Sequence, residues 1–118
     1  MDHANIKLVA GTDMQSAAQT AASNAARDAF VAHRLAAVQD GESEAYFDLG
    51  MAFCTGSDAL AVDLVEAHKW FNLAAVGGHD HAAQCRADVA EDMTAREIAE
   101  AQRRAREWLR ASPAMRVA

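Results

Sequence analysis

Apolar residues recur every three or four positions along most of this chain, the spacing that gathers them on one face of an α-helix. Start and stop signals divide the pattern into five predicted helices, at about residues 12–38, 43–55, 63–76, 80–92 and 94–112. Asp63 and Thr94 each precede a glutamate by three positions, as a residue that caps a helix often does. Glycines at positions 41, 56 and 77–78 end the first three helices.

The apolar stripes also predict the core. They consist of Tyr46, Leu49, Gly50 and Phe53 in the second helix, Leu64, Ala67, Phe71 and Ala74 in the third, and Ile98, Ala101, Ala105, Trp108 and Leu109 in the fifth. Because the connections between helices are short, consecutive helices should pack antiparallel to one another. We therefore predict an all-α fold of about five antiparallel helices with these aromatic rings in its core.

Composition favours a single helical domain. The chain has 118 residues, enough for one modest core, and 52% of them are apolar although only 6% are aromatic. Alanine, the strongest helix former, makes up about a quarter of the chain. No apolar run approaches the ~18 residues of a membrane helix, no signal-peptide pattern opens the chain, and two cysteines are too few for a disulfide scaffold. We expect a cytoplasmic protein with no membrane span.

The predicted domain covers residues 13–111. Residues 1–12 contain Ile6, Leu8 and Val9, and we interpret them either as an arm that lies on the domain or on a partner, or as a frayed end. Residues 112–118 form a short tail.

The sequence also repeats weakly after 37 residues. The aligned pairs are Ala37 with Ala74, Gly41 with Gly78, and Ala45 with Ala82. A period of this length is typical of stacked helical hairpins, in which neighbouring units cover each other's apolar faces.

The second and third predicted helices carry small and aromatic residues at fixed spacing. These positions are Ala45, Leu49, Gly50, Phe53, Gly56, Ala67, Trp70, Ala74, Ala75, Gly78 and Ala82. The stretch at about residues 45–82 resembles one complete Sel-one-like repeat, a relative of the tetratricopeptide repeat. The flanks match in part. Phe30 and His33 stand where Ala67 and Trp70 do, and Arg86, Ala87 and Ala90 replace residues expected downstream.

The resemblance implies a short right-handed α/α superhelix, or solenoid, whose degenerate last repeat acts as a cap. In such a hairpin Gly50 would let the paired helix approach closely, with Phe53 and Trp70 filling the space beside it. The resemblance also implies a non-catalytic role in protein–protein interaction, as a small adaptor, regulator or accessory subunit of a larger assembly.

The reactive side chains follow no spacing typical of a catalytic or metal site. His79 and His81 lie two positions apart at a helix start, while His33 and His68 belong to other helices. A zinc site needs three or four converging ligands, and neither CxxC nor HExxH occurs. We expect no metal, no cofactor and no enzymatic activity. The alternative is a small-ligand binder or hydrolase of the β-lactam-binding type found among distant, cysteine-rich relatives.

A second apolar stripe on the helix at 43–55 predicts a binding surface. It consists of Phe47, Met51 and Cys54. The repeat places three polar residues beside it, namely Gln84, Asp88 and Glu91. A groove with an apolar and an acidic wall would suit a peptide or helix with basic and apolar residues. The alternative is that the first helix covers and buries Phe47 and Met51.

Charge is unevenly distributed along the chain. Residues 42–93 hold ten acidic and two basic side chains, whereas residues 94–118 hold six basic and three acidic ones. Nucleic-acid binding would need a contiguous basic surface, so it is unlikely and could use only the last helix. The arginines of that helix could instead face an acidic partner, or could pair with Glu100 and Glu107 on a solvated face. They are Arg96, Arg103, Arg104, Arg106 and Arg110.

Overall fold

The computed structural model describes residues 22, 24–36, 42–57 and 60–111. The chain divides into two units, residues 1–33 and 34–118. The described residues of the first unit are helical, and their helix continues to residue 36. The described part of the second unit contains the helices α2 (Glu42–Thr55), α3 (Leu64–Val76), α4 (Ala82–Ala90) and α5 (Ala95–Ala111). No strand occurs among the described residues, so the predicted all-α class is confirmed for that part of the chain.

The predicted helices agree with the observed ones to within two residues at each end for α2, α3, α4 and α5. Of the first predicted helix, the described part at residues 24–36 is helical. The proposed arm at residues 1–12 and the tail at residues 112–118 lie outside the described residues.

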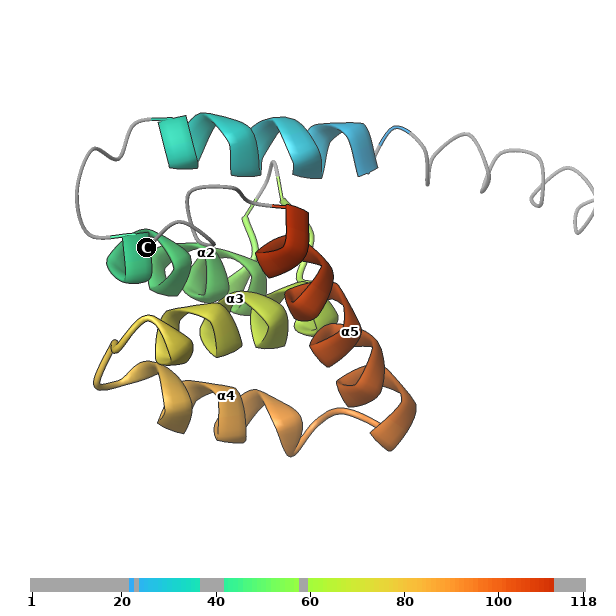
Figure 1. Cartoon of the computed structure of the whole chain (residues 1–118). Helices are drawn as coiled ribbons and strands as arrows, with labels where there is room; N and C mark the ends of the chain where they lie inside the picture. The colour runs from blue at the N-terminus through green and yellow to red at the C-terminus, as the bar shows by residue number, and fades with distance from the viewer. Residues whose placement is uncertain (1–21, 23, 37–41, 58–59, 112–118) are drawn as a thin grey trace, which may run out of the picture. The chain divides into compact units, whose positions relative to one another are not determined.

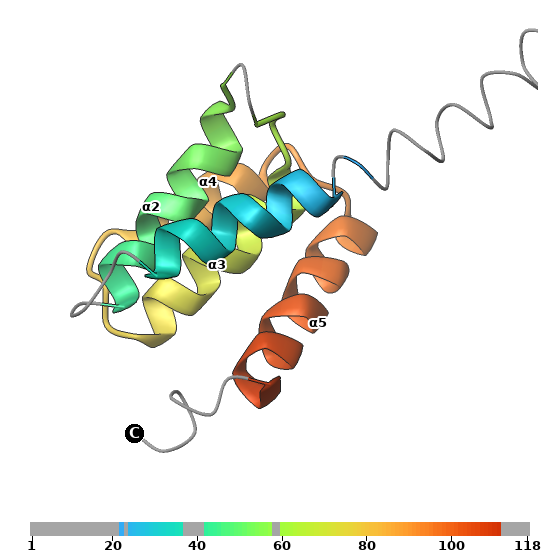
Figure 2. The ribbon, with the colours of Figure 1, turned by 90° about the horizontal axis from the view of Figure 1, so that it is seen from above.

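Helix α3 is the centre of the second unit and packs against α2, α4 and α5. Figures 1 and 2 show α2 and α4 on two sides of α3, each running antiparallel to it. The largest fully buried side chains come from α2 and α3, and they are Trp70, Phe53, Phe71, Leu49 and Leu73. The core is therefore the interface of α3 with its neighbours. The apolar stripes predicted it in part: Trp70 and Leu73 were not among them, and four predicted core residues are only half-buried, namely Leu64, Ile98, Trp108 and Leu109.

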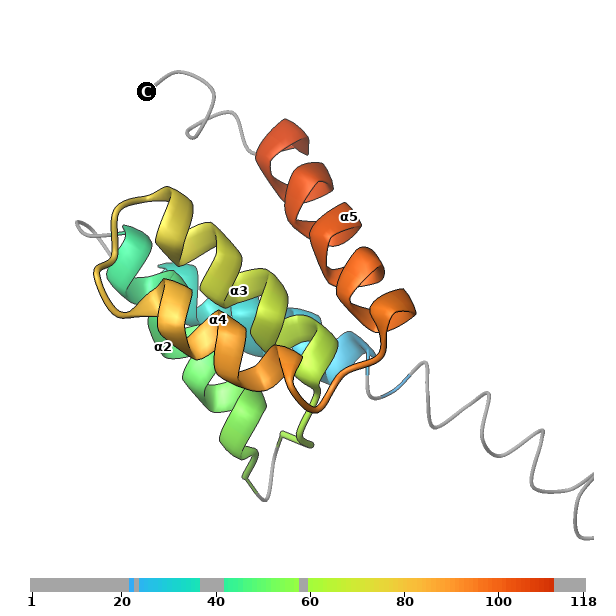
Figure 3. The same ribbon diagram turned by 90° about the horizontal axis from the view of Figure 1, so that it is seen from below.

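Helix α5 departs from the expected arrangement. It turns away from α4 after residue 94 and crosses α3, so the predicted antiparallel pairing of α5 with α4 is wrong (Figures 1 and 3). The physical reason is that two large α5 side chains bind elsewhere: Arg104 reaches Glu66 on α3, and Trp108 reaches Tyr46 on α2. Its buried residues, Ala101 and Ala105, are small enough to let α5 approach α3.

The helix ends follow the predicted capping signals. The side chain of Asp63 accepts a hydrogen bond of 3.1 Å from the Glu66 backbone N–H at the start of α3. Before α5, Thr94 and Glu97 cap each other reciprocally, with hydrogen bonds of 3.1 and 2.8 Å. The loop after α3 turns at Gly78, whose φ of 97° lies in the left-handed region that favours glycine.

Gly50 of α2 lies directly against the ring of Phe71 on α3. A Cβ atom at this position would lie 2.5 Å from Cδ1 of Phe71, so any side chain there would collide with the ring. The close approach agrees with the role expected for Gly50. The ring that fills the space is that of Phe71, however, and not Phe53 or Trp70 as the resemblance implied. Trp70 instead faces Tyr46 and Trp108.

Candidate functional site

The second apolar stripe of α2 begins at Phe47, whose ring lies beside the loop that leads into α4. Phe47 stacks on the imidazole of His79, with ring centroids 4.1 Å apart and planes 10° apart. It also meets His81 nearly edge-on at 6.1 Å and Phe71 at 5.7 Å. Phe47 is half-buried, and its ring contacts all three of these neighbouring rings.

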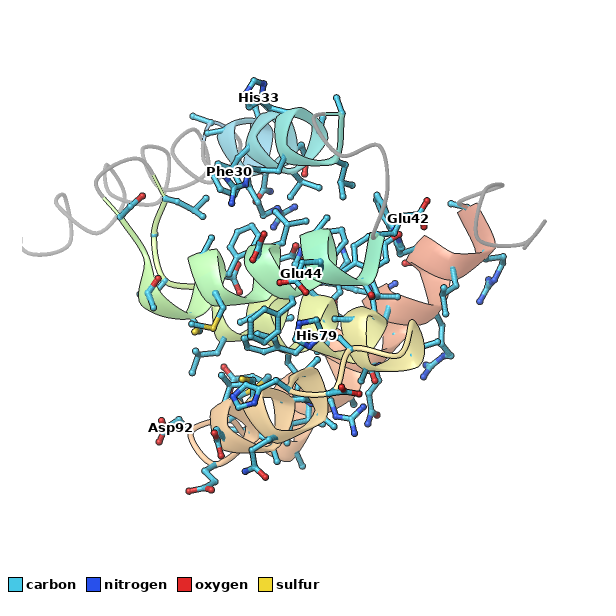
Figure 4. The ribbon with its side chains drawn as sticks, turned by 90° about the vertical axis from the view of Figure 1, so that its left-hand side faces the viewer. Phe30, His33, Glu42, Glu44, His79 and Asp92 are labelled. Carbon is cyan, nitrogen blue, oxygen red and sulfur yellow. The ribbon has the colours of Figure 1, made fainter. Side chains whose placement is uncertain are left out.

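His79 connects this ring cluster to a carboxylate. Its Nε2 atom lies 2.9 Å from Oε2 of Glu44, and its Nδ1 atom accepts a 3.2 Å hydrogen bond from the backbone N–H of His81. Because Nδ1 accepts a hydrogen bond, a neutral His79 carries its proton on Nε2, the nitrogen that lies beside the Glu44 carboxylate. Figure 4 shows Glu44 and His79 directed toward each other on one side of the second unit.

Farther along α2, the stripe continues through Met51 and Cys54. Met51 is 39% exposed, while Cys54 is half-buried and its thiol donates to the backbone carbonyl of Met51. Burial raises the pKa of the Cys54 thiol, and the nearby Cys85 of α4 raises it further. Burial, followed by the charge of Asp88, also raises the pKa of Cys85. Both thiols are therefore weak nucleophiles at neutral pH.

The three polar residues predicted to flank this stripe lie on the exposed side of α4 or at its end. Gln84 donates a 2.9 Å hydrogen bond to Asp88, and Glu91 occupies the C-terminal cap of the helix. All three are exposed. We call the combined surface the α2–α4 face. It consists of Glu44, Phe47, Met51 and Cys54 of α2 with His79, His81, Gln84, Asp88 and Glu91.

The basic residues predicted on α5 fall into two groups. Arg103 donates to Glu100 with hydrogen bonds of 2.7 and 2.9 Å and also pairs with Glu107, as the helical spacing predicts. Arg103, then Arg104, lowers the pKa of Glu100 to about 2. Arg96, Arg106 and Arg110 are exposed and make no ion pair within the described part of the chain. These three define the basic α5 face.

A buried polar cluster between α3 and α5 was not predicted from the sequence. Glu66 is only 3% exposed, and its carboxylate accepts hydrogen bonds from Trp70 Nε1 at 3.2 Å and from Arg104 at 2.8 Å. Lys69 lies 3.6 Å from the same carboxylate and 4.3 Å from the centroid of the Trp70 ring. The Glu66–Trp70 spacing of four positions was a signal for their contact, but nothing local pointed to Arg104.

Aromatic rings complete the attachment of α5. Trp108 donates a 3.2 Å hydrogen bond from Nε1 to the hydroxyl of Tyr46, and it meets Trp70 edge-on at 5.0 Å. Each polar atom named in this cluster is paired with another side chain, and each ring packs on its neighbours. The arrangement fixes α5 on α3 and leaves the opposite side of α5 to carry the exposed arginines.

His68 is the remaining buried titratable side chain of note. It is 4% exposed, and its Nδ1 atom has no hydrogen-bond partner among the described residues. Burial, followed by the positive charge of Arg86, lowers the pKa of His68. Arg86 itself donates a 2.6 Å hydrogen bond to Asn72, which joins α4 to α3. His68 is thus neutral and structural at pH 7.

Comparisons with known protein families, with curated proteins and with solved structures gave no match for this chain. The resemblance to Sel-one-like repeats therefore depends on the motif residues and stays a prediction. Within the described residues, no helix has both the length and the apolar character needed to cross a bilayer.

Proposed function

We propose that this protein is a non-catalytic interaction module whose α2–α4 face binds a basic and apolar segment of a protein. The observation that carries the proposal is the exposed Met51, one turn along α2 from the Phe47–His79 stack. Glu44 lies at the stack, and Asp88 is exposed on α4. An apolar centre with a charged rim is the usual layout of a protein-binding surface.

The side chains of the α2–α4 face indicate the chemical type of partner that it would bind. Methionine is flexible and polarizable, so Met51 can adapt to apolar groups of different shape. Arginine suits the rest of the face because it pairs with carboxylates and stacks on aromatic rings. The best-fitting ligand is therefore a helix or extended peptide with arginines next to one or two apolar residues.

We further propose that α2 and α3 form one Sel-one-like repeat and that α2 and α4 are the first helices of successive hairpins in a short superhelix. The antiparallel order of α2, α3 and α4 supports this, as does the close approach at Gly50. The fully buried Ala67 and Ala74 keep the helices close. In cells such a module would act as a cytoplasmic adaptor, regulator or accessory subunit.

A panel of labelled peptides tests this function. Fluorescence anisotropy should detect binding of peptides rich in arginine and leucine, and no binding of acidic or uncharged peptides.

Met51→Lys and Asp88→Lys should each weaken binding about tenfold. Val62→Lys is the matched control, since Val62 is an exposed apolar residue outside the face. Equal binding by all three variants would exclude this face, and hydrolysis of a β-lactam reporter by the pure chain would contradict the non-catalytic role.

A further inference from the structure

We propose that the basic α5 face of a second copy of this chain occupies the α2–α4 face. This inference depends on the function proposed above and names the partner. The protein would then associate with itself through an acidic surface on one copy and a basic surface on the next.

The chemistry of α5 matches what the α2–α4 face is suited to bind. Arg106 and Arg110 are four positions apart and so share one side of the helix, and both are exposed. Their guanidinium groups make no ion pair within the described residues, unlike that of Arg103. Leu109, three positions after Arg106, is half-buried and supplies an apolar group beside that arginine.

The acidic surface offers the complementary charges. Glu44, Asp88 and Glu91 are exposed on the α2–α4 face, and Asp48 is exposed on α2. Residues 42–93 hold ten acidic and two basic side chains, and of these four carboxylates only that of Glu44 has an ion-pair partner among the described residues, namely His79. Opposite charge on the two surfaces would both attract and orient two copies.

The contact must form between copies and cannot form within one chain. Arg104 binds Glu66 and Trp108 binds Tyr46, so the inner side of α5 is fixed on α3. Helix α5 and the Glu44–His79 pair also lie on different sides of the second unit. Helix α5 lies at the right of Figure 1, whereas Figure 4, seen from the left, shows Glu44 and His79 facing the viewer. A rigid α5 also loses little conformational entropy on binding.

Because the two surfaces differ, the contact is head-to-tail, and it would generate either a closed ring or a longer chain of copies. The attraction would also be screened by salt, because the Debye length falls from ~8 Å at about 0.15 M to ~3 Å at about 1 M. Sedimentation velocity should therefore show association of the purified chain at low ionic strength and monomers at high ionic strength.

Charge reversal tests which surfaces meet. The double variants Arg106→Glu/Arg110→Glu and Asp88→Lys/Glu91→Lys should each weaken self-association about tenfold or more at low salt. Arg27→Glu, which reverses a charge in the first unit, is the control and should associate like the unaltered chain. A circular dichroism spectrum of each variant confirms that the helices are retained.

An equimolar mixture of the two double variants is the decisive experiment. The basic α5 face of one still fits the acidic face of the other, so the mixture should associate more strongly than either variant alone. A chain that stays monomeric up to about 1 mM at low salt, or a mixture that stays monomeric, would overturn the inference. If the monomeric chain still binds the arginine–leucine peptides, the proposed function stands and its ligand is another protein. If it binds none, both proposals fail.

Discussion

Arg104 of α5 donates a 2.8 Å hydrogen bond to Glu66 of α3, although the two residues are 38 positions apart. The carboxylate is buried, and Trp70 donates a second hydrogen bond to it. The Arg104 side chain is 31% exposed, so water partly solvates it. A buried carboxylate needs such partners, and here they come from both helices that the contact joins.

Replacing Glu66 with glutamine should lower the free energy of unfolding by about 1–3 kcal/mol, because the amide removes the charge that faces Arg104 and Lys69. Urea denaturation measures this loss. The matched control is Glu107→Gln, since Glu107 pairs with Arg103 on the surface and is 58% exposed. It should change stability by less than about 0.5 kcal/mol. Equal losses in the two variants would show that the Glu66 pair contributes no more than a surface one.

Gly50→Ala should destabilise the protein by roughly 1–3 kcal/mol, because the new methyl group would overlap the fully buried ring of Phe71. A double-mutant cycle with Phe71→Leu measures whether that ring is the cause. The smaller leucine should relieve the overlap, so the two changes together should cost clearly less than the sum of their separate effects. Strict additivity would mean that the methyl group is accommodated in some other way.

His68 should make the protein less stable in mild acid. Its pKa is lowered from 6.5 by burial and by Arg86, so below pH 6.5 the unfolded chain binds a proton that the folded chain resists. The stability that depends on a neutral, buried His68 is fully present above about pH 6.5 and is lost as the pH falls below that value. Denaturation at about pH 7.5 and about pH 5.5 should show this loss in the unaltered protein.

Two variants isolate the contribution of His68. His68→Leu removes the titrating group and an unpartnered buried nitrogen, so it should flatten the pH dependence and leave stability at pH 7 unchanged or higher. His81→Asn, which replaces an exposed histidine, is the matched control. A steep slope retained in His68→Leu would assign the acid sensitivity to other groups.

The features predicted correctly from the sequence depend on neighbours a few residues away. Asp63 and Thr94 cap their helices through groups three positions on, and Arg103 pairs with glutamates three and four positions away. Such contacts are fixed as soon as a helix forms. The apolar spacing of three and four positions is likewise a local pattern, so it also predicted the helices correctly.

The features that were missed depend on how the helices rotate and cross. Trp70 and Phe71 are adjacent, and periodicity alone does not determine which of the two rings meets Gly50. The contact of Trp108 with Tyr46 spans 62 positions and exists only because α5 crosses α3 instead of following α4. In the candidate site, Phe47 and Met51 were identified from spacing, whereas His79 is brought beside Phe47 and Glu44 of α2 by the loop after α3.

The last prediction distinguishes a residue that only contacts the partner from a residue that also stabilises the α2–α4 face. Phe47 contacts Phe71, His79 and His81, whereas Met51 is exposed one turn farther along α2. Phe47→Ala should therefore weaken peptide binding and also cost about 1–3 kcal/mol of stability, less than the loss of a fully buried ring. Met51→Ala should weaken binding while changing stability by less than about 0.5 kcal/mol.

Hydrogen exchange at the backbone amide of His81 measures directly whether Phe47 orders the loop into α4. The backbone N–H of His81 donates to His79 Nδ1, and the Phe47 ring holds that imidazole in place. Phe47→Ala should speed exchange at His81 because the imidazole loses its stacking partner, and Phe47→Leu should restore part of the protection. Met51→Ala should leave this amide unchanged. If Phe47→Ala also leaves it unchanged, the stack does not order the loop into α4, and Phe47 contributes only as a contact for the partner.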